Sequence, residues 1–168
     1  MEQAAWYSFS KLMDPSRYGG TEFHHNLARF VENCFRGDDG TSLPFRERMA
    51  KTWITASVSC IIPTKATDEV PEEVAVRCAE NYLLRELALF APRKPVLVAM
   101  GKSKAAARLR LLGIDGFIET WHPGKPAAIR RHREGESKPC LACNLGYAAA
   151  QVRYPHRHRR SDVWNWPR

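Results

Sequence analysis

The sequence contains no long hydrophobic run, and this absence excludes a membrane-spanning helix from the expected architecture. None of its apolar segments approaches the roughly 20 residues that an α-helix needs to cross a bilayer. Residues 1–6 also lack the basic stretch followed by an apolar stretch that marks a secretory signal. We therefore expect a cytoplasmic protein without membrane contact, in which disulfides are a poor explanation for the five cysteines.

Acidic residues are scarce at the C-terminal end, where basic charge gathers. From Trp121 onward, ten Lys or Arg residues against three Asp or Glu residues give +7 of the total net charge of +8. Such a segment suits a polyanion, of which nucleic acid is the usual one, although a solvated tail explains it equally well. We expect a monomer with one domain over residues 1–152 and a basic tail over residues 153–168.

Hydrophobic periodicity predicts alternating helices and strands. Leu27, Phe30 and Val31 belong to one apolar helix face, and Gly37 ends that helix. Further helices are predicted over residues 2–13, 71–91, 103–112, 125–133 and 140–151, and strands over 53–62, 96–100 and 114–120. This alternation favours a three-layer α/β/α fold with a small, mostly parallel central sheet that lacks its first strand.

A histidine follows the last predicted strand directly. The sequence Thr120-Trp121-His122-Pro123 places a polar turn just after an apolar run. Because ligands of α/β sheets bind at the carboxyl ends of the strands, this position indicates a functional role for His122. The alternative is a histidine that only caps the strand end through bonds to the backbone.

Five motifs, taken in order, carry a family resemblance. They are Ile54–Cys60, Pro71–Glu73, Cys78–Leu83, Val96–Gly101 and Thr120–Pro123. In this order and spacing, over residues 20–130, the chain resembles the uracil-DNA glycosylase superfamily and is most similar to its iron–sulfur branch. The resemblance implies an N-glycosidase that removes uracil or a related damaged base from single- or double-stranded DNA in base-excision repair.

The resemblance also implies roles for particular residues. His122 would stabilise negative charge on a flipped-out leaving base, as an oxyanion hole does. Basic side chains would contact the DNA backbone, namely Lys65, Lys125, Arg130 and Arg131. Ala56 stands where relatives carry an asparagine that reads the uracil edge, so Ser57 is the candidate base-binding residue in its place.

One family motif is missing from the sequence. Nothing in residues 1–20 resembles the Gly-rich turn that positions the attacking water and often supplies an aromatic side chain against the base. Either the motif lies upstream of Met1, or the chain has lost catalysis and is a nucleic-acid-binding module on the same fold. A third hypothesis is a metal-stabilised interaction protein whose basic tail binds an acidic partner.

The cysteines suggest a metal site. By position, the resemblance implies that Cys60 and Cys78 are two ligands of a [4Fe–4S] cluster. The family's N-terminal Cys-x-x-Cys is absent, whereas Cys140 and Cys143 form such a pair at the other end of the chain. Four converging thiolates can hold this cluster or, as the lesser alternative, zinc. Otherwise the first two are small buried residues and the pair is incidental, while Cys34 is expected in the core.

Overall fold

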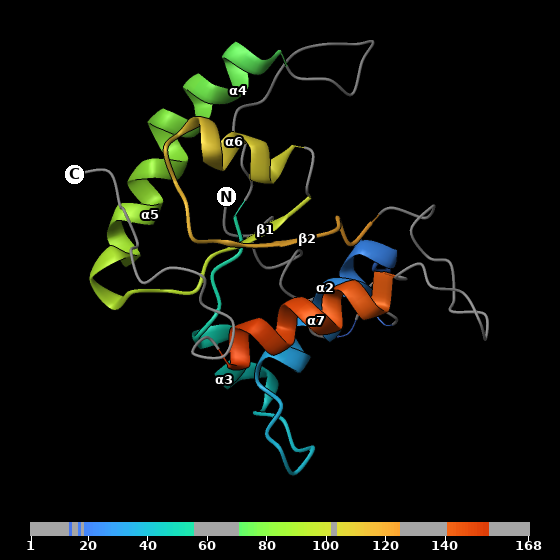
Figure 1. Cartoon of the computed structure of the whole chain (residues 1–168). Coiled ribbons are helices and arrows are strands. Elements are labelled where there is room, and N and C mark those ends of the chain that lie inside the picture. Colours follow the sequence, from blue (N-terminus) through green and yellow to red (C-terminus); the bar gives the residue numbers. More distant parts are fainter. Residues whose placement is uncertain are drawn as a thin grey trace.

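The structure, a computed structural model, describes residues 14, 17, 19–55, 71–101, 104–124 and 141–154 (Figure 1). Over these residues the chain is a mixed α/β structure, in which helices surround a two-stranded parallel sheet. This arrangement confirms the predicted α/β class. Among the same residues, no helix combines the length and the apolar character needed to cross a membrane.

The sheet pairs β1 (Val98–Met100) with β2 (Ile118–Thr120) in parallel, and Ala99 lies opposite Glu119. Side chains alternate along a strand, so the two faces of this short sheet carry different residues. Ala99 packs into one hydrophobic cluster, whereas the side chains before and after it pack into another. The sheet is thereby covered on both faces, as parallel sheets require.

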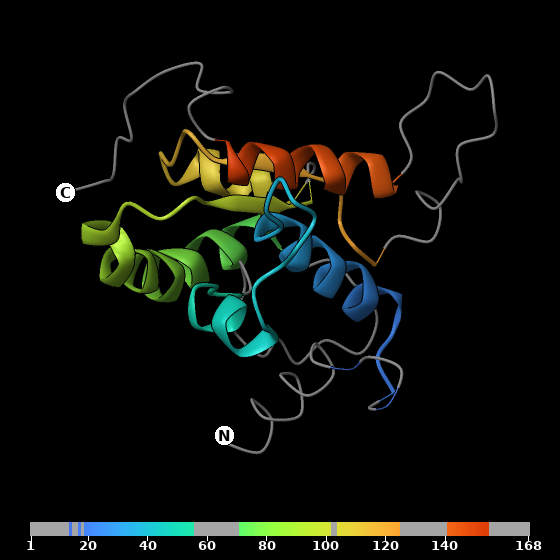
Figure 2. The same cartoon turned by 90° about the horizontal axis from the view of Figure 1, so that it is seen from below.

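Helices α2 (Glu22–Cys34) and α7 (Leu141–Arg153) cover one face and pack side by side (Figures 1 and 2). The apolar stripe that the sequence predicts for α2 is buried here, and small residues of α7 let the two helices approach closely. The buried residues of this cluster are Leu27, Phe30, Val31, Leu145, Ala148 and Ala149. Helix α3 (Phe45–Ala50) contacts α2.

The opposite face is covered by α6 (Ala105–Leu111) and by a helical rod of four segments. The rod comprises α4 (Glu72–Cys78), a π-helical turn (Ala79–Leu83), α5 (Leu84–Phe90) and a 3₁₀ turn (Ala91–Arg93). Apart from Ala99, the buried residues of this cluster are Ala79, Leu83, Leu87, Ala106, Leu109 and Ile114. Helix α6 is the crossover that joins the two parallel strands.

Several predicted elements differ from the structure. The two strands of the sheet are shorter than the predicted ranges 96–100 and 114–120. A strand is predicted over residues 53–62, but its first three residues form no strand. The centre of the Trp53 ring lies 5.2 Å from that of Phe90. The rest of that strand and the helices predicted over residues 2–13 and 125–133 lie outside the described residues. The helices predicted over 71–91, 103–112 and 140–151 correspond to the helical rod, α6 and α7.

Cys34 packs against the cluster between α2 and α7, as expected for a core residue. Burial raises the pKa of its thiol to about 12, and the positive charge of Arg153 lowers the pKa by a smaller amount. Arg153 is itself anchored at the end of α7, where its guanidinium donates to the backbone carbonyl of Arg36 at 3.0 Å. The native thiol is therefore protonated at neutral pH.

This raised pKa predicts a loss of stability in alkali. Above pH 9.0, the ordinary pKa of a cysteine thiol, the unfolded chain loses the Cys34 proton, while the folded chain keeps it up to about pH 12. Stability therefore falls as pH rises through this window, by at most about 1.4 kcal/mol per pH unit. Chemical denaturation between pH 8 and 11 should show a shallower decline for Cys34→Ala than for the parent chain. Equal slopes in the two proteins would contradict the assignment.

Candidate functional site

His122 lies where the two strands end. It is exposed and follows β2 by two residues. The amide of Gly101, just past β1, donates to the carbonyl of Thr120 at 2.8 Å, so the carboxyl ends of both strands meet beside His122. Gly101 has a φ of +125°, and a Cβ built on it would lie 4.0 Å from the Cβ of His122. The turn between β1 and α6 therefore passes close to the histidine.

One backbone bond determines how the ring of His122 can act. The amide of Gly124 donates to Nδ1 of His122 at 3.1 Å. Nδ1 must be unprotonated to accept this bond, so a neutral ring carries its proton on Nε2. The turn thus makes the side chain a hydrogen-bond donor through Nε2–H, at the edge of the sheet where ligands bind.

An aromatic side chain, Phe23, lies between two imidazole rings. Its ring centre is 5.5 Å from that of His122 at an interplanar angle of 31°, and 5.5 Å from that of His24 at 89°. His24 is half-buried, and its Nδ1 accepts the backbone amide of Thr21 at 3.1 Å, which caps the start of α2. Phe23 supplies an apolar surface beside the His122 ring.

Sequence reasoning missed Phe23, although a signal for it exists. Phe23 precedes Leu27 by four residues and Phe30 by seven, so it extends the apolar stripe of α2 by one turn toward the site. The contact of its ring with Phe23 also places His24 at the margin of the site.

Two asparagines bond to the backbone and side chains that flank His122. Oδ1 of Asn144 in α7 accepts from Oγ1 of Thr120 at 2.7 Å and from the amide of Trp121 at 2.8 Å. Nδ2 of Asn26 in α2 donates to the carbonyl of Pro123 at 2.8 Å. The turn is therefore tied to a helix on each side of the histidine.

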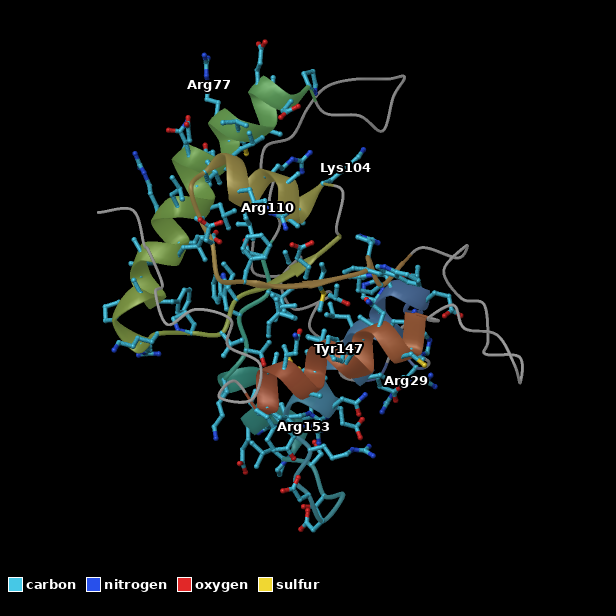
Figure 3. All side chains as sticks on the ribbon, viewed as in Figure 1. Arg29, Arg77, Lys104, Arg110, Tyr147 and Arg153 are labelled. Atoms are coloured by element: carbon cyan, nitrogen blue, oxygen red, sulfur yellow. The ribbon has the colours of Figure 1, made fainter. Side chains whose placement is uncertain are left out.

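The helices run opposite to the strands, so several of them begin at the same edge as His122. Figures 1 and 2 show α2, α6 and α7 starting there. Helix amino ends carry partial positive charge and favour anions nearby. The exposed side chain of Lys104 adds a full positive charge at the start of α6 (Figure 3). Arg110, farther along α6, is paired with Glu119.

Apart from His122, the residues predicted to touch DNA or the base lie outside the described part of the chain. These are Lys65, Lys125, Arg130 and Arg131 for the backbone and Ser57 for the base. Gly124, the residue before Lys125, lies beside the His122 ring.

The described cysteines do not come together as a metal site requires. Cys78 is buried in α4, whereas Cys143 is exposed on α7, and these helices pack over opposite faces of the sheet (Figure 1). Cys60 and Cys140 lie outside the described residues. Within the described ranges, no three His, Cys, Asp or Glu side chains gather as metal ligands. Cys78 and Cys143 therefore lie on opposite sides of the sheet, and the four-thiolate site stays a prediction.

This placement predicts the result of removing one thiol. Cys143→Ser should leave the iron and zinc content per chain and the thermal unfolding temperature unchanged, because the exposed thiol lies on the other side of the sheet from Cys78. Elemental analysis and a thermal melt of the two purified proteins check it. A loss of bound metal together with a lower unfolding temperature would instead establish the four-thiolate site.

Comparison of the chain with protein-family models, with curated proteins and with solved structures found no match.

Proposed function

We propose that the chain is a DNA N-glycosidase of the uracil-DNA glycosylase type, in which His122 is the catalytic residue. The observation that carries this proposal is the bond from the Gly124 amide to Nδ1, which leaves Nε2–H as the donor of an exposed ring at the carboxyl edge. A fixed donor is what the departure of an anionic base requires. The ordered motifs of the sequence supply the substrate class.

The chemistry follows from charge development. As the bond between C1′ and the base nitrogen breaks, its electron pair goes to the base and negative charge gathers on a carbonyl oxygen. Nε2–H of His122 donates to that oxygen, while the sugar becomes oxocarbenium-like. Water then adds to C1′, and its released proton balances the charge of the leaving base. One well-placed donor of this kind contributes about 3–4 kcal/mol to the transition state.

The surroundings of His122 suit an extruded nucleotide. The bond to be broken cannot be reached inside a stacked duplex, so the base has to leave the helix. Phe23 offers an aromatic surface at 5.5 Å from the imidazole, against which a flat base can stack. The helix amino ends and Lys104 favour the phosphates of the same strand. The basic segment that begins at Lys125 would extend this contact along the DNA.

The fold assignment that accompanies this function is a three-layer α/β/α arrangement with a small parallel sheet. It is supported by two hydrophobic clusters, one on each face of the β1–β2 pair. We propose that the protein acts as a cytoplasmic monomer with one domain and a basic tail.

The second candidate is a catalytically incomplete nucleic-acid-binding module. The observation that favours it is Ala56, which stands where relatives carry the asparagine that reads the uracil edge. The two candidates share the scaffold and the basic segment, so DNA binding alone does not separate them. Release of the base distinguishes the enzyme from the binding module.

The test is base release from single- and double-stranded oligonucleotides that contain one uracil. We expect alkali-labile sites with the parent chain, and a rate lowered by about 100- to 1000-fold in His122→Ala, because one transition-state donor is lost. Binding to the same oligonucleotides should change little. His25→Ala is the matched control, since that imidazole lies on the first turns of α2 and should leave the rate unchanged.

Two results would contradict the proposal. Parental excision that persists in His122→Ala would remove the catalytic role of the histidine. Tight binding without any base release by the parent chain would favour the incomplete module.

A further inference from the structure

We propose that Asn144 and Asn26 are positioning residues that hold His122 in its reactive orientation. This inference rests on the proposed function, because it concerns how the donor of that reaction is fixed. Each asparagine acts through the backbone or the side chain of a residue within two positions of His122.

Asn144 fixes the approach to the histidine. Its Oδ1 accepts two bonds, one from the Thr120 hydroxyl at 2.7 Å and one from the Trp121 amide at 2.8 Å. Thr120 is fully buried, so its hydroxyl depends on a protein partner rather than on water. The Trp121 amide is the last backbone donor before His122. One oxygen atom therefore determines where β2 ends and in which direction the chain leaves it.

Asn26 fixes the exit from the histidine. Its Nδ2 donates to the carbonyl of Pro123 at 2.8 Å, across 97 positions of sequence. Pro123 is fully buried, and its ring restricts the backbone further. The amide of Gly124 then donates to Nδ1 of His122 at 3.1 Å. The orientation of the imidazole is set by a turn that is bonded on both sides.

The two asparagines can position the turn because their own helices are rigidly placed. Asn26 immediately precedes Leu27, and Asn144 immediately precedes Leu145. Both leucines are buried in the cluster between α2 and α7. A shift of either helix would thus move one end of the turn. Since a misplacement of about 1 Å can cost roughly 100-fold in rate, such anchoring is kinetically important.

The variants are chosen to separate positioning from general stability. Asn144→Leu removes the accepting oxygen at similar size, whereas Asn144→Asp keeps an acceptor at the same place. Gln151→Leu is the matched control, because it introduces the same side chain on α7, near the other end of that helix. Asn26→Ala is the second variant, and Asn33→Ala on α2 is its control.

For excision of uracil from a single-stranded oligonucleotide, Asn144→Leu should lower kcat by about 100-fold, as an ångström-scale misplacement would. Its KM should stay within about threefold, because the asparagine does not contact DNA in this account. Asn144→Asp should restore most of kcat. Asn26→Ala should lower kcat in the same way and to a smaller degree, since it removes one bond rather than two, and both controls should match the parent.

A second readout does not depend on activity. Long-range ¹H–¹⁵N spectra of the imidazoles, with the His122 signals assigned from their loss in His122→Ala, report which ring nitrogen carries the proton. The parent and Asn144→Asp should show an unprotonated Nδ1. Asn144→Leu should show exchange between the two neutral forms, because the Gly124 amide is no longer held against Nδ1.

The results distinguish this inference from the proposed function. A parent chain that releases no uracil but shows these tautomer changes would leave the positioning role intact and remove the reaction. Parental kcat and parental ring-nitrogen signals in Asn144→Leu would overturn the positioning role. If Asn144→Leu does not fold, the same two measurements on Asn26→Ala decide the question.

Discussion

The parallel pairing of β1 with β2 determines how the other described elements are arranged. Parallel strands need a crossover, which α6 supplies, and the crossover brings both carboxyl ends to one edge. The helices return in the opposite direction, so their amino ends gather at that edge too (Figure 1). So short a pair has little stability of its own. It is held by the two hydrophobic clusters that bury its faces.

The site is a consequence of that pairing. The bond from Gly101 to Thr120 closes the sheet, and the next residues have to turn away from it. Because Asn144 and Asn26 tie this turn to α7 and α2, the position of His122 depends on the cluster between those helices. In this proposal, the packing of α2 against α7 on one face of the sheet orients the His122 ring at its edge.

Local sequence patterns could predict some of this arrangement but not all of it. The apolar run before Thr120 and the His-Pro turn after it placed His122 at a strand end, because strand and turn are adjacent in sequence. The amphipathic stripe of α2 was equally readable. The hydrogen-bond partners of the turn could not be predicted, because the Asn26 bond spans 97 positions of sequence and no periodicity encodes it. Residues 53–55, where the sequence predicts the start of a strand, are not part of the sheet, and the Trp53 ring contacts Phe90.

If His122 acts as proposed, its Nε2–H faces the leaving base. The most direct measurement is the imidazole ¹⁵N spectrum during titration with a short single strand that carries 2′-fluoro-2′-deoxyuridine, which resists cleavage. A strand with thymidine at that position is the comparison. We expect a saturable shift of Nε2 of His122 with the fluorinated uridine strand and a much smaller shift with the thymidine strand. An Nε2 signal that ignores both strands, or that responds equally to both, would contradict it.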